Sequence, residues 1–165
     1  MKRILFGLVT LCSMVVFCGV SGGADLKIKD YVFTWIVYKA PDLEMDIEKK
    51  PQDVMAVLAG PGGGLGRVTI TPKEARAIGE ILKKTQKYYD DQVSKRDMNA
   101  KDVVEVGSFK VIFSSSRGKN FGVSVASTKI FGSAANMSKE DALAVAPYLC
   151  QAPEMAALVQ KRIKP

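Results

Sequence analysis

Four acidic side chains near the start of the chain have a spacing that could serve chemistry. Asp42, Glu44, Asp46 and Glu48 alternate with apolar residues, so a β-strand would carry all four carboxylates on one face. Neighbouring members of this acidic ladder would lie about 6.5–7 Å apart, too far for a compact Ca²⁺ cage without ligands from other segments. We therefore interpret the ladder as a solvated or edge face, or as a surface for a protein or cationic partner.

Basic side chains gather in three places that suit anionic partners. The sets are Lys83, Lys84 and Lys87; Lys161, Arg162 and Lys164; and Lys110, Arg117, Lys119 and Lys129. Phe109 and Phe121 lie near the third set, which predicts a platform where single-stranded nucleic acid could stack. The alternative is that these are core phenylalanines beside surface lysines.

Several catalytic arrangements are excluded by composition. The chain has no histidine, which removes Ser-His-Asp and Cys-His catalysis and imidazole metal sites. The serines at 114–116 lack the Ser-x-x-Lys spacing of a nucleophile. We therefore expect no catalytic residue, cofactor or metal site. A hydrolase with a carboxylate-only site stays as an alternative, and it requires two acids in one pocket, at least one with a strongly raised pKa.

A glycine-rich segment at 60–66 superficially resembles a phosphate loop. It lacks the Lys-Ser/Thr ending of a P-loop and does not match G-x-G-x-x-G. A predicted strand follows it, so no helix N-terminus would face an anion. The segment predicts a hairpin loop.

The first 24 residues have the features of an export signal. Lys2 and Arg3 precede an uncharged run over 4–20, and Gly22 and Ala24 supply the small residues for cleavage after position 24. We expect a periplasmic or secreted protein. The alternatives are an uncleaved N-terminal anchor and a lipid on Cys18, either of which would place the protein at a membrane surface.

Removal of this leader changes the charge and the cysteine chemistry. The leader holds two of the 24 basic residues and none of the 17 acidic ones, so the net charge falls from +7 to +5. Cys150 is then the one remaining cysteine of three, which excludes an intramolecular disulfide. We interpret it as a buried small hydrophobe, with an intermolecular disulfide as the alternative.

Hydrophobic periodicity predicts alternating strands and helices. The expected strands are 26–39, 42–48, 54–59, 67–71, 103–114, 120–126 and 129–131, and the expected helices are 72–93, 138–147 and one from 153. Thr71 and Ser138 are the predicted helix caps, and Pro147 should end or kink its helix. The stretch 31–38 is apolar on both alternating sets, which favours a central strand covered on both faces.

The two predicted helix starts, 71–78 and 138–145, can be aligned, and several strands precede each. This suggests two strand-strand-strand-helix units packed as one domain. The order of elements is similar to that of the PUR repeat and the Whirly-type single-strand binders. The likeness rests on residues 67–71 leading into a helix after a glycine-rich turn and on the Phe109–Phe121 hairpin. It implies a polyanion or single-stranded nucleic-acid ligand.

These observations predict a single α+β domain over 25–165, with a mostly antiparallel sheet, one long helix and one or two C-terminal helices. We expect an exported, non-catalytic binding or interaction protein of the cell envelope or exterior, whose partner is a protein or an envelope component. Export makes nucleic acid an improbable ligand. A protein-binding role predicts an exposed apolar patch near a charged face, whereas polyanion binding predicts an affinity that falls steeply with salt.

Overall fold

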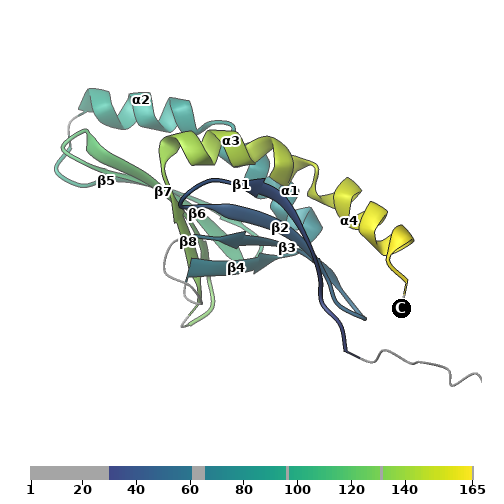
Figure 1. Cartoon of the computed structure of the whole chain (residues 1–165). Coiled ribbons are helices and arrows are strands. Elements are labelled where there is room, and N and C mark those ends of the chain that lie inside the picture. The colour runs from purple at the N-terminus through teal and green to yellow at the C-terminus, as the bar shows by residue number, and fades with distance from the viewer. Residues whose placement is uncertain (1–29, 61–65, 96, 131, 165) are drawn as a thin grey trace, which may run out of the picture.

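The computed structural model describes residues 30–60, 66–95, 97–130 and 132–164. They form two four-stranded antiparallel sheets covered on one side by helices, which is the predicted α+β class (Figure 1). The predicted leader, its alternative lipid site and the middle of the glycine-rich segment lie outside the described residues.

The chain folds as two successive units with the same order of elements. The first contains β1 (Phe33–Lys39), β2 (Glu44–Lys49), β3 (Val54–Ala59), β4 (Arg67–Ile70), α1 (Pro72–Leu82) and α2 (Thr85–Lys95). The second contains β5 (Ala100–Val106), β6 (Phe109–Ser116), β7 (Lys119–Ser127), β8 (Ala134–Met137), α3 (Lys139–Cys150) and α4 (Ala152–Arg162). Each unit therefore has four strands and two helices, not the predicted three strands and one helix.

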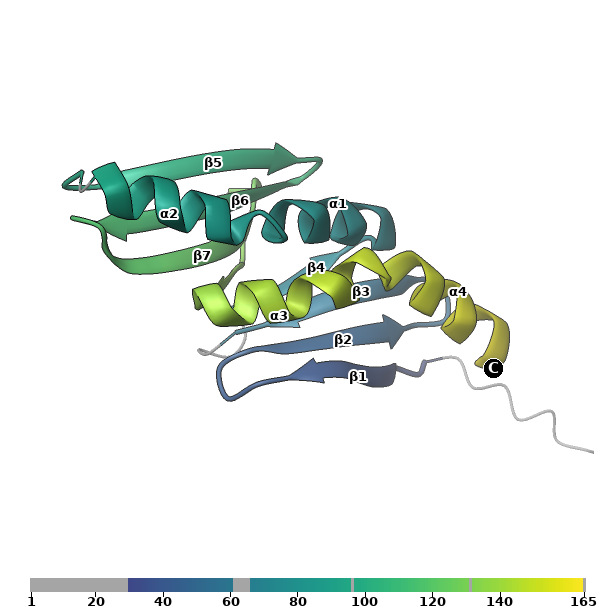
Figure 2. The ribbon, with the colours of Figure 1, turned by 90° about the horizontal axis from the view of Figure 1, so that it is seen from above.

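Both sheets are simple meanders, ordered β1-β2-β3-β4 and β5-β6-β7-β8. The helices form one layer, in which α1 and α3 lie side by side, α2 lies over the second sheet and α4 over the first (Figure 2). The core lies between this layer and the sheets, and it includes Met45, Leu58, Ile78, Phe113 and Leu149. Burial of such side chains is the main favourable contribution to folding.

The prediction of one long helix over 72–93 is wrong in one respect. The structure has two helices there, α1 and α2. Thr71 caps α1 as predicted, its hydroxyl accepting from the Glu74 N–H. The break follows at Lys83 and Lys84, where the buried Thr85 hydroxyl donates to the Leu82 carbonyl at 2.6 Å. Such a side-chain bond to a nearby carbonyl competes with the helical pattern.

Pro147 neither ends nor sharply redirects its helix. Ser138 caps α3 as predicted, but α3 continues through Pro147 to Cys150. The chain turns only at Gln151, where α4 begins and the two axes differ by 51°. Among the described residues no single helix has the length and apolar character of a membrane span; only this bent pair, taken together, has them.

Two predicted strands of the second unit are also corrected. The stretch 103–114 is not one strand but a hairpin, because Gly107 adopts a positive φ of 55° and reverses the chain between β5 and β6. A short strand was expected at 129–131, but the structure has the short strand β8 later in the chain, at Ala134–Met137. Positions 129 and 130 instead form part of a turn, closed by the Gly132 N–H on the Lys129 carbonyl at 2.9 Å.

The first strand is not central, as its sequence predicted, but lies at the edge of its sheet. Within the described ranges β1 pairs with β2 alone, with an irregularity in register between Ile36 and Tyr38. Its apolar residues are therefore partly exposed, including Trp35 and Ile36. Apolar residues on both faces are equally compatible with a central strand and with an edge strand that contacts another molecule.

Candidate functional site

The acidic ladder is not an edge face, as we had expected, because β2 lies between β1 and β3. Asp42 is exposed in the turn before β2. Glu44 forms an ion pair with Lys39 at 2.7 Å, and Glu48 forms one with Arg67. The two outer carboxylates of the strand are thus neutralised by cations from β1 and β4, and the ladder presents little free negative charge to a partner.

Asp46, between these pairs, has a different environment. Its side chain is 2% exposed, and its Oδ1 has no hydrogen-bond partner within the described ranges. It lies opposite Val57, on the sheet face away from the helices, where Arg67 reaches across β3 to Glu48. Desolvation by burial and the charge of Glu44 raise the pKa of Asp46 from 3.8 to about 6.

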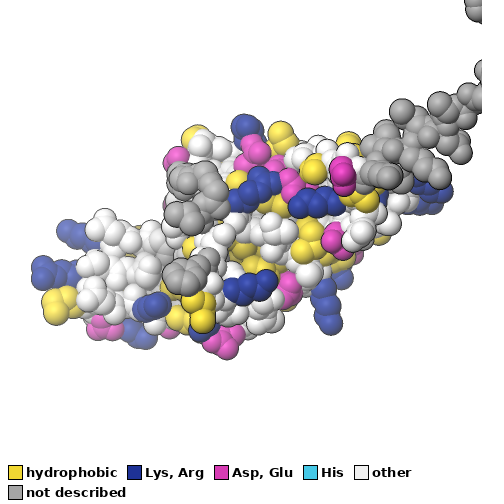
Figure 3. Space-filling view, turned by 90° about the horizontal axis from the view of Figure 1, so that it is seen from below, with side chains coloured by type: hydrophobic (Ala, Val, Ile, Leu, Met, Phe, Trp, Pro, Cys, Tyr) yellow, Lys and Arg dark blue, Asp and Glu magenta, His cyan; other side chains and the backbone are white. Residues whose placement is uncertain are grey.

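The basic residues of the predicted sites do not converge on one surface. Lys83, Lys84 and Lys87 are exposed around the α1–α2 break, and Lys83 pairs with Glu80. In the other unit, Lys110 pairs with Glu105 at 3.0 Å, and Arg117 and Lys119 are exposed in the β6–β7 turn. Seen from below, cationic and acidic side chains are interspersed over the sheet faces (Figure 3).

The predicted aromatic stacking platform is not assembled. Phe109 is buried, and Phe121 packs edge-on against Tyr89 of α2, so both contribute to the core beneath the helices. Lys110 alternates with Phe109 along β6 and therefore faces the opposite side of the sheet. The cations and the aromatic rings are thus separated by the sheet itself.

An exposed apolar surface runs along β1 and the facing side of the C-terminal helices. We call it the β1 edge surface, and it comprises Val32, Phe33, Trp35, Ile36, Tyr148, Leu158 and Ile163. Phe33 and Trp35 face α4, whereas Ile36 lies opposite Asp46 on the face of β1 away from the helices. Val32 is 59% exposed and Ile36 is 51% exposed, which is unusual for side chains of this size. The sequence indicated these residues as strand but gave no signal that the strand is at an edge.

A groove lies within this surface, between β1 and α4. It has a volume of about 240 Å³ and is lined by Phe33, Trp35, Leu158, Val159, Arg162 and Ile163. Behind it, the Lys49 ammonium is buried and donates to the Gln160 side chain at 3.0 Å. Lys161, Arg162 and Lys164 are exposed beside it at the end of the chain. The groove is therefore apolar with a positive rim.

Metal ligation has no support in the described part of the chain, where no group of three or more acidic or cysteine side chains is placed to hold an ion. The Cys150 thiol donates to Glu80 at 3.1 Å. The sequence predicted that Cys150 is buried, but the residue is only half-buried. Burial, followed by the negative charge of Glu80, raises the pKa of this thiol.

Comparison with known proteins yields a fold likeness only. No family model and no curated protein matches the chain. One solved structure is similar, a protein of unknown function from the DUF155 family of Prochlorococcus sp. NATL2A. The likeness has a TM-score of 0.50 at 7% identity and covers 72% of this chain and 98% of that one. It supports the α+β architecture.

Proposed function

We propose that this chain is an exported, non-catalytic binding protein whose partner is an extended polypeptide segment. The segment docks on the β1 edge surface. The single observation that carries this proposal is the exposed apolar edge of β1 beside the positive rim of α4. It is the apolar patch near a charged face that a protein-binding role predicts.

The geometry of an edge strand favours an extended partner. Among the described residues, β1 is hydrogen-bonded to a strand on one side only, which would leave its outer backbone groups available to a further strand. Trp35 and Phe33 line the groove toward α4, where alternate side chains of an added strand would insert. Main-chain hydrogen bonds then supply affinity, and the groove supplies selectivity.

The charge near the groove favours an acidic partner. The buried Lys49 ammonium and the exposed Arg162 lie beside it, and the described ion pairs include neither of them. An apolar residue flanked by Asp or Glu would fill the groove and neutralise its rim. Such complementarity raises the rate of association and discriminates against cationic segments.

The test uses Trp35, which is the only tryptophan in the chain. Peptides are selected from a displayed random library on residues 25–165 and then synthesised and titrated while Trp35 emission is followed. We expect selected peptides to combine apolar and acidic residues and to shift the emission to shorter wavelength. Ile36→Glu should weaken them about tenfold or more, because it places a negative charge on β1 beside the acidic docked strand.

Val103→Glu provides the matched control, because Val103 is a similarly exposed residue on the edge strand of the other sheet. It should leave the affinity within about twofold. Failure to select any peptide, or equal binding by Ile36→Glu, contradicts the proposal. Tight, salt-sensitive binding of a dT oligonucleotide without a change in Trp35 emission would instead support the polyanion alternative.

Export is tested separately. The protein is produced with its own leader in a Gram-negative bacterium, and its intact mass is measured in each cell fraction. A soluble periplasmic species that begins at Asp25 supports export, whereas lipid mass on Cys18 supports attachment to the envelope. A full-length soluble product in the cytoplasm contradicts the leader hypothesis.

A further inference from the structure

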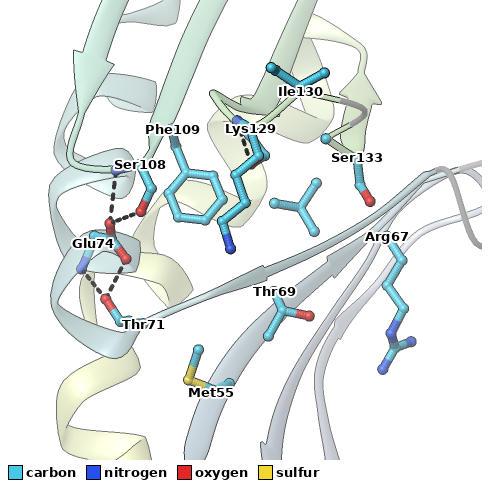
Figure 4. Close-up of a pocket in the computed structure, with 13 residues that line it drawn as sticks. Met55, Arg67, Thr69, Thr71, Glu74, Ser108, Phe109, Lys129, Ile130 and Ser133 are labelled. Atoms are coloured by element: carbon cyan, nitrogen blue, oxygen red, sulfur yellow. Dashed lines mark hydrogen bonds between the residues drawn. The ribbon is translucent and has the colours of Figure 1, made fainter.

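A second cleft opens where the two sheets meet, on the opposite side of the first sheet from β1. It has a volume of about 460 Å³ and receives residues from both units (Figure 4). Met55, Arg67 and Thr69 come from β3 and β4, while the other wall comes from the second unit and includes Ser108, Phe109, Lys129, Ile130 and Ser133. This volume lies in the range of small-molecule sites.

Lys129, an exposed residue, provides a positive charge at the mouth of this cleft. Its side chain extends into the space between Phe109 and Thr69 (Figure 4). Within the described residues its ammonium has no ion pair or hydrogen bond, whereas Arg67 on the facing wall is paired with Glu48. In the part of the chain that the structure describes, the Lys129 charge is therefore not neutralised by an acidic side chain.

Glu74, the acidic residue of the cleft, does not form an ion pair with the Lys129 ammonium in the described part of the chain. One of its oxygens accepts from the Ser108 hydroxyl at 2.8 Å and from the Ser108 N–H at 3.0 Å, and the other accepts from Thr71 at 2.6 Å. Burial alone would raise the pKa of Glu74, but these hydrogen bonds hold it below its usual value. Its charge is thus already stabilised within the protein.

The remaining lining combines Ser and Thr side chains with apolar residues. Met55 is half-buried, Phe109 is 6% exposed, and Ile130 is 88% exposed at the lip. Ile130 points away from the base of the cleft (Figure 4). A ligand with an apolar body would bury Met55 and part of Ile130, at a gain of about 25 cal/mol per Å² of surface removed from water.

Hydrogen bonds fix the backbone on either side of the Lys129 side chain. Thr128 binds the Ser108 carbonyl through both its N–H and its hydroxyl, at 2.9 and 3.0 Å. The Lys129 N–H donates to the Ser127 hydroxyl at 3.3 Å. The site is thus largely formed before a ligand arrives, which lowers the entropic cost of binding.

We propose that this cleft binds a small amphipathic carboxylate. The carboxylate pairs with the Lys129 ammonium and accepts hydrogen bonds from the Thr69 and Ser133 hydroxyls. The apolar body lies against Phe109 and Met55. A carboxylate fits better than a neutral ligand because an unpaired cation at the mouth of an apolar cleft is stabilised by an opposite charge.

The test measures methyl NMR spectra of residues 25–165 during titration with 4-phenylbutyrate, with its amide and with acetate. We expect 4-phenylbutyrate to shift the Ile130 and Met55 methyl signals with a Kd of about 1 mM or lower. Ile36, on the far edge of the first sheet, serves as an internal reference and should not shift. The amide and acetate should bind about tenfold more weakly, since each lacks one half of the recognised chemistry.

Two variants test the Lys129 charge and the shape of the cleft separately. Lys129→Gln should reduce the affinity for 4-phenylbutyrate about five- to tenfold without changing that for the amide. Thr69→Tyr should fill the cleft and abolish both. Lys119→Gln and Ser114→Tyr are the matched controls outside the cleft, and neither should alter binding. Absence of the Ile130 shift at about 10 mM, equal affinity for acid and amide, or full binding by Thr69→Tyr overturns the proposal.

Discussion

Glu74 in the first turn of α1 receives two hydrogen bonds from Ser108, one from its backbone nitrogen and one from its hydroxyl. Ser108 belongs to the β5–β6 turn of the second unit, so this contact joins the helix of one unit to the sheet of the other. The same Glu74 side chain also completes the cap of α1 through Thr71. One carboxylate thereby fixes both the start of a helix and the packing of two units.

Replacement of this carboxylate should therefore destabilise the whole domain. We expect Glu74→Gln to lower the free energy of unfolding at pH 7 by about 1–2 kcal/mol, because an amide cannot accept all of these hydrogen bonds. The pKa of Glu74 is lowered by folding, so its contribution is present above its unfolded value of 4.5 and is lost as the pH falls through the folded value. Urea denaturation at pH 7 and at pH 3 measures both effects.

Glu140→Gln, in the first turn of α3, is the control and should change the free energy of unfolding by less than about 0.5 kcal/mol. A loss equal to that of Glu74→Gln would refute the role of Ser108.

The contact between α1 and α3 depends on a glycine. A Cβ on Gly79 would lie 2.8 Å from the Ala146 carbonyl oxygen, from the Cys150 nitrogen and from the Cys150 sulfur. Gly→Ala inside a helix normally stabilises by about 1 kcal/mol, but here the backbone of α3 would have to move. We expect Gly79→Ala to destabilise the protein by about 2 kcal/mol or more, measured by thermal denaturation. Ala144→Gly on the exposed side of α3 is the comparison, with a loss of about 1 kcal/mol from helix propensity alone; a stabilised Gly79→Ala would contradict the close approach.

Cys150 should react slowly. Burial and the adjacent Glu80 carboxylate raise the pKa of its thiol, while Lys83 acts in the opposite direction. At pH 8 we expect alkylation by iodoacetamide about tenfold slower than for free cysteine, since only the thiolate reacts. Glu80→Gln should accelerate the reaction and Lys83→Gln should slow it further, as followed by intact mass. The same low reactivity predicts a monomer mass under non-reducing conditions, and a disulfide-linked dimer would restore the alternative interpretation of Cys150.

The two helix starts, which follow from neighbouring residues, were predicted correctly. The caps at Thr71 and Ser138 depend on an acidic residue three positions later, so a short segment determines them. The edge position of β1 was not predicted, because it depends on which strands pair and not on the composition of the strand. The end of α1 was also not predicted. It depends on one hydrogen bond from the Thr85 hydroxyl, and the helical periodicity of the surrounding residues gives no sign of it.

The candidate sites depend even more on contacts between distant residues. Glu48 and Arg67 are 19 positions apart, and their pairing explains why the ladder has little free charge. The cleft around Lys129 is assembled from both units, so no single segment contains its pattern. Phe109 and Lys110 are adjacent in sequence and face opposite sides of a sheet, which separates the residues of the predicted stacking platform.

The buried carboxylate of Asp46 makes a last prediction, on the pH dependence of stability. Its folded pKa of about 6 lies above its unfolded value of 3.8. The folded state therefore binds the proton more tightly, and the ionised group destabilises the protein progressively as the pH rises from about 4 to about 6. Glu44 and Glu48 strengthen this effect, whereas Lys39 and Arg67 weaken it.

Asp46→Asn removes the charge while keeping the shape. Between pH 4 and pH 8, its stability relative to the natural chain should rise by about 2 kcal/mol. The absolute value at pH 4 also includes the cost of an unpaired amide, so the change with pH is the informative quantity. Chemical denaturation at four pH values between 4 and 8 gives this difference directly. Asp42→Asn, in the exposed turn before β2, should show no such trend. A stability difference that does not vary with pH would mean that Asp46 is solvated or paired in solution, and that Arg67 does not cover it.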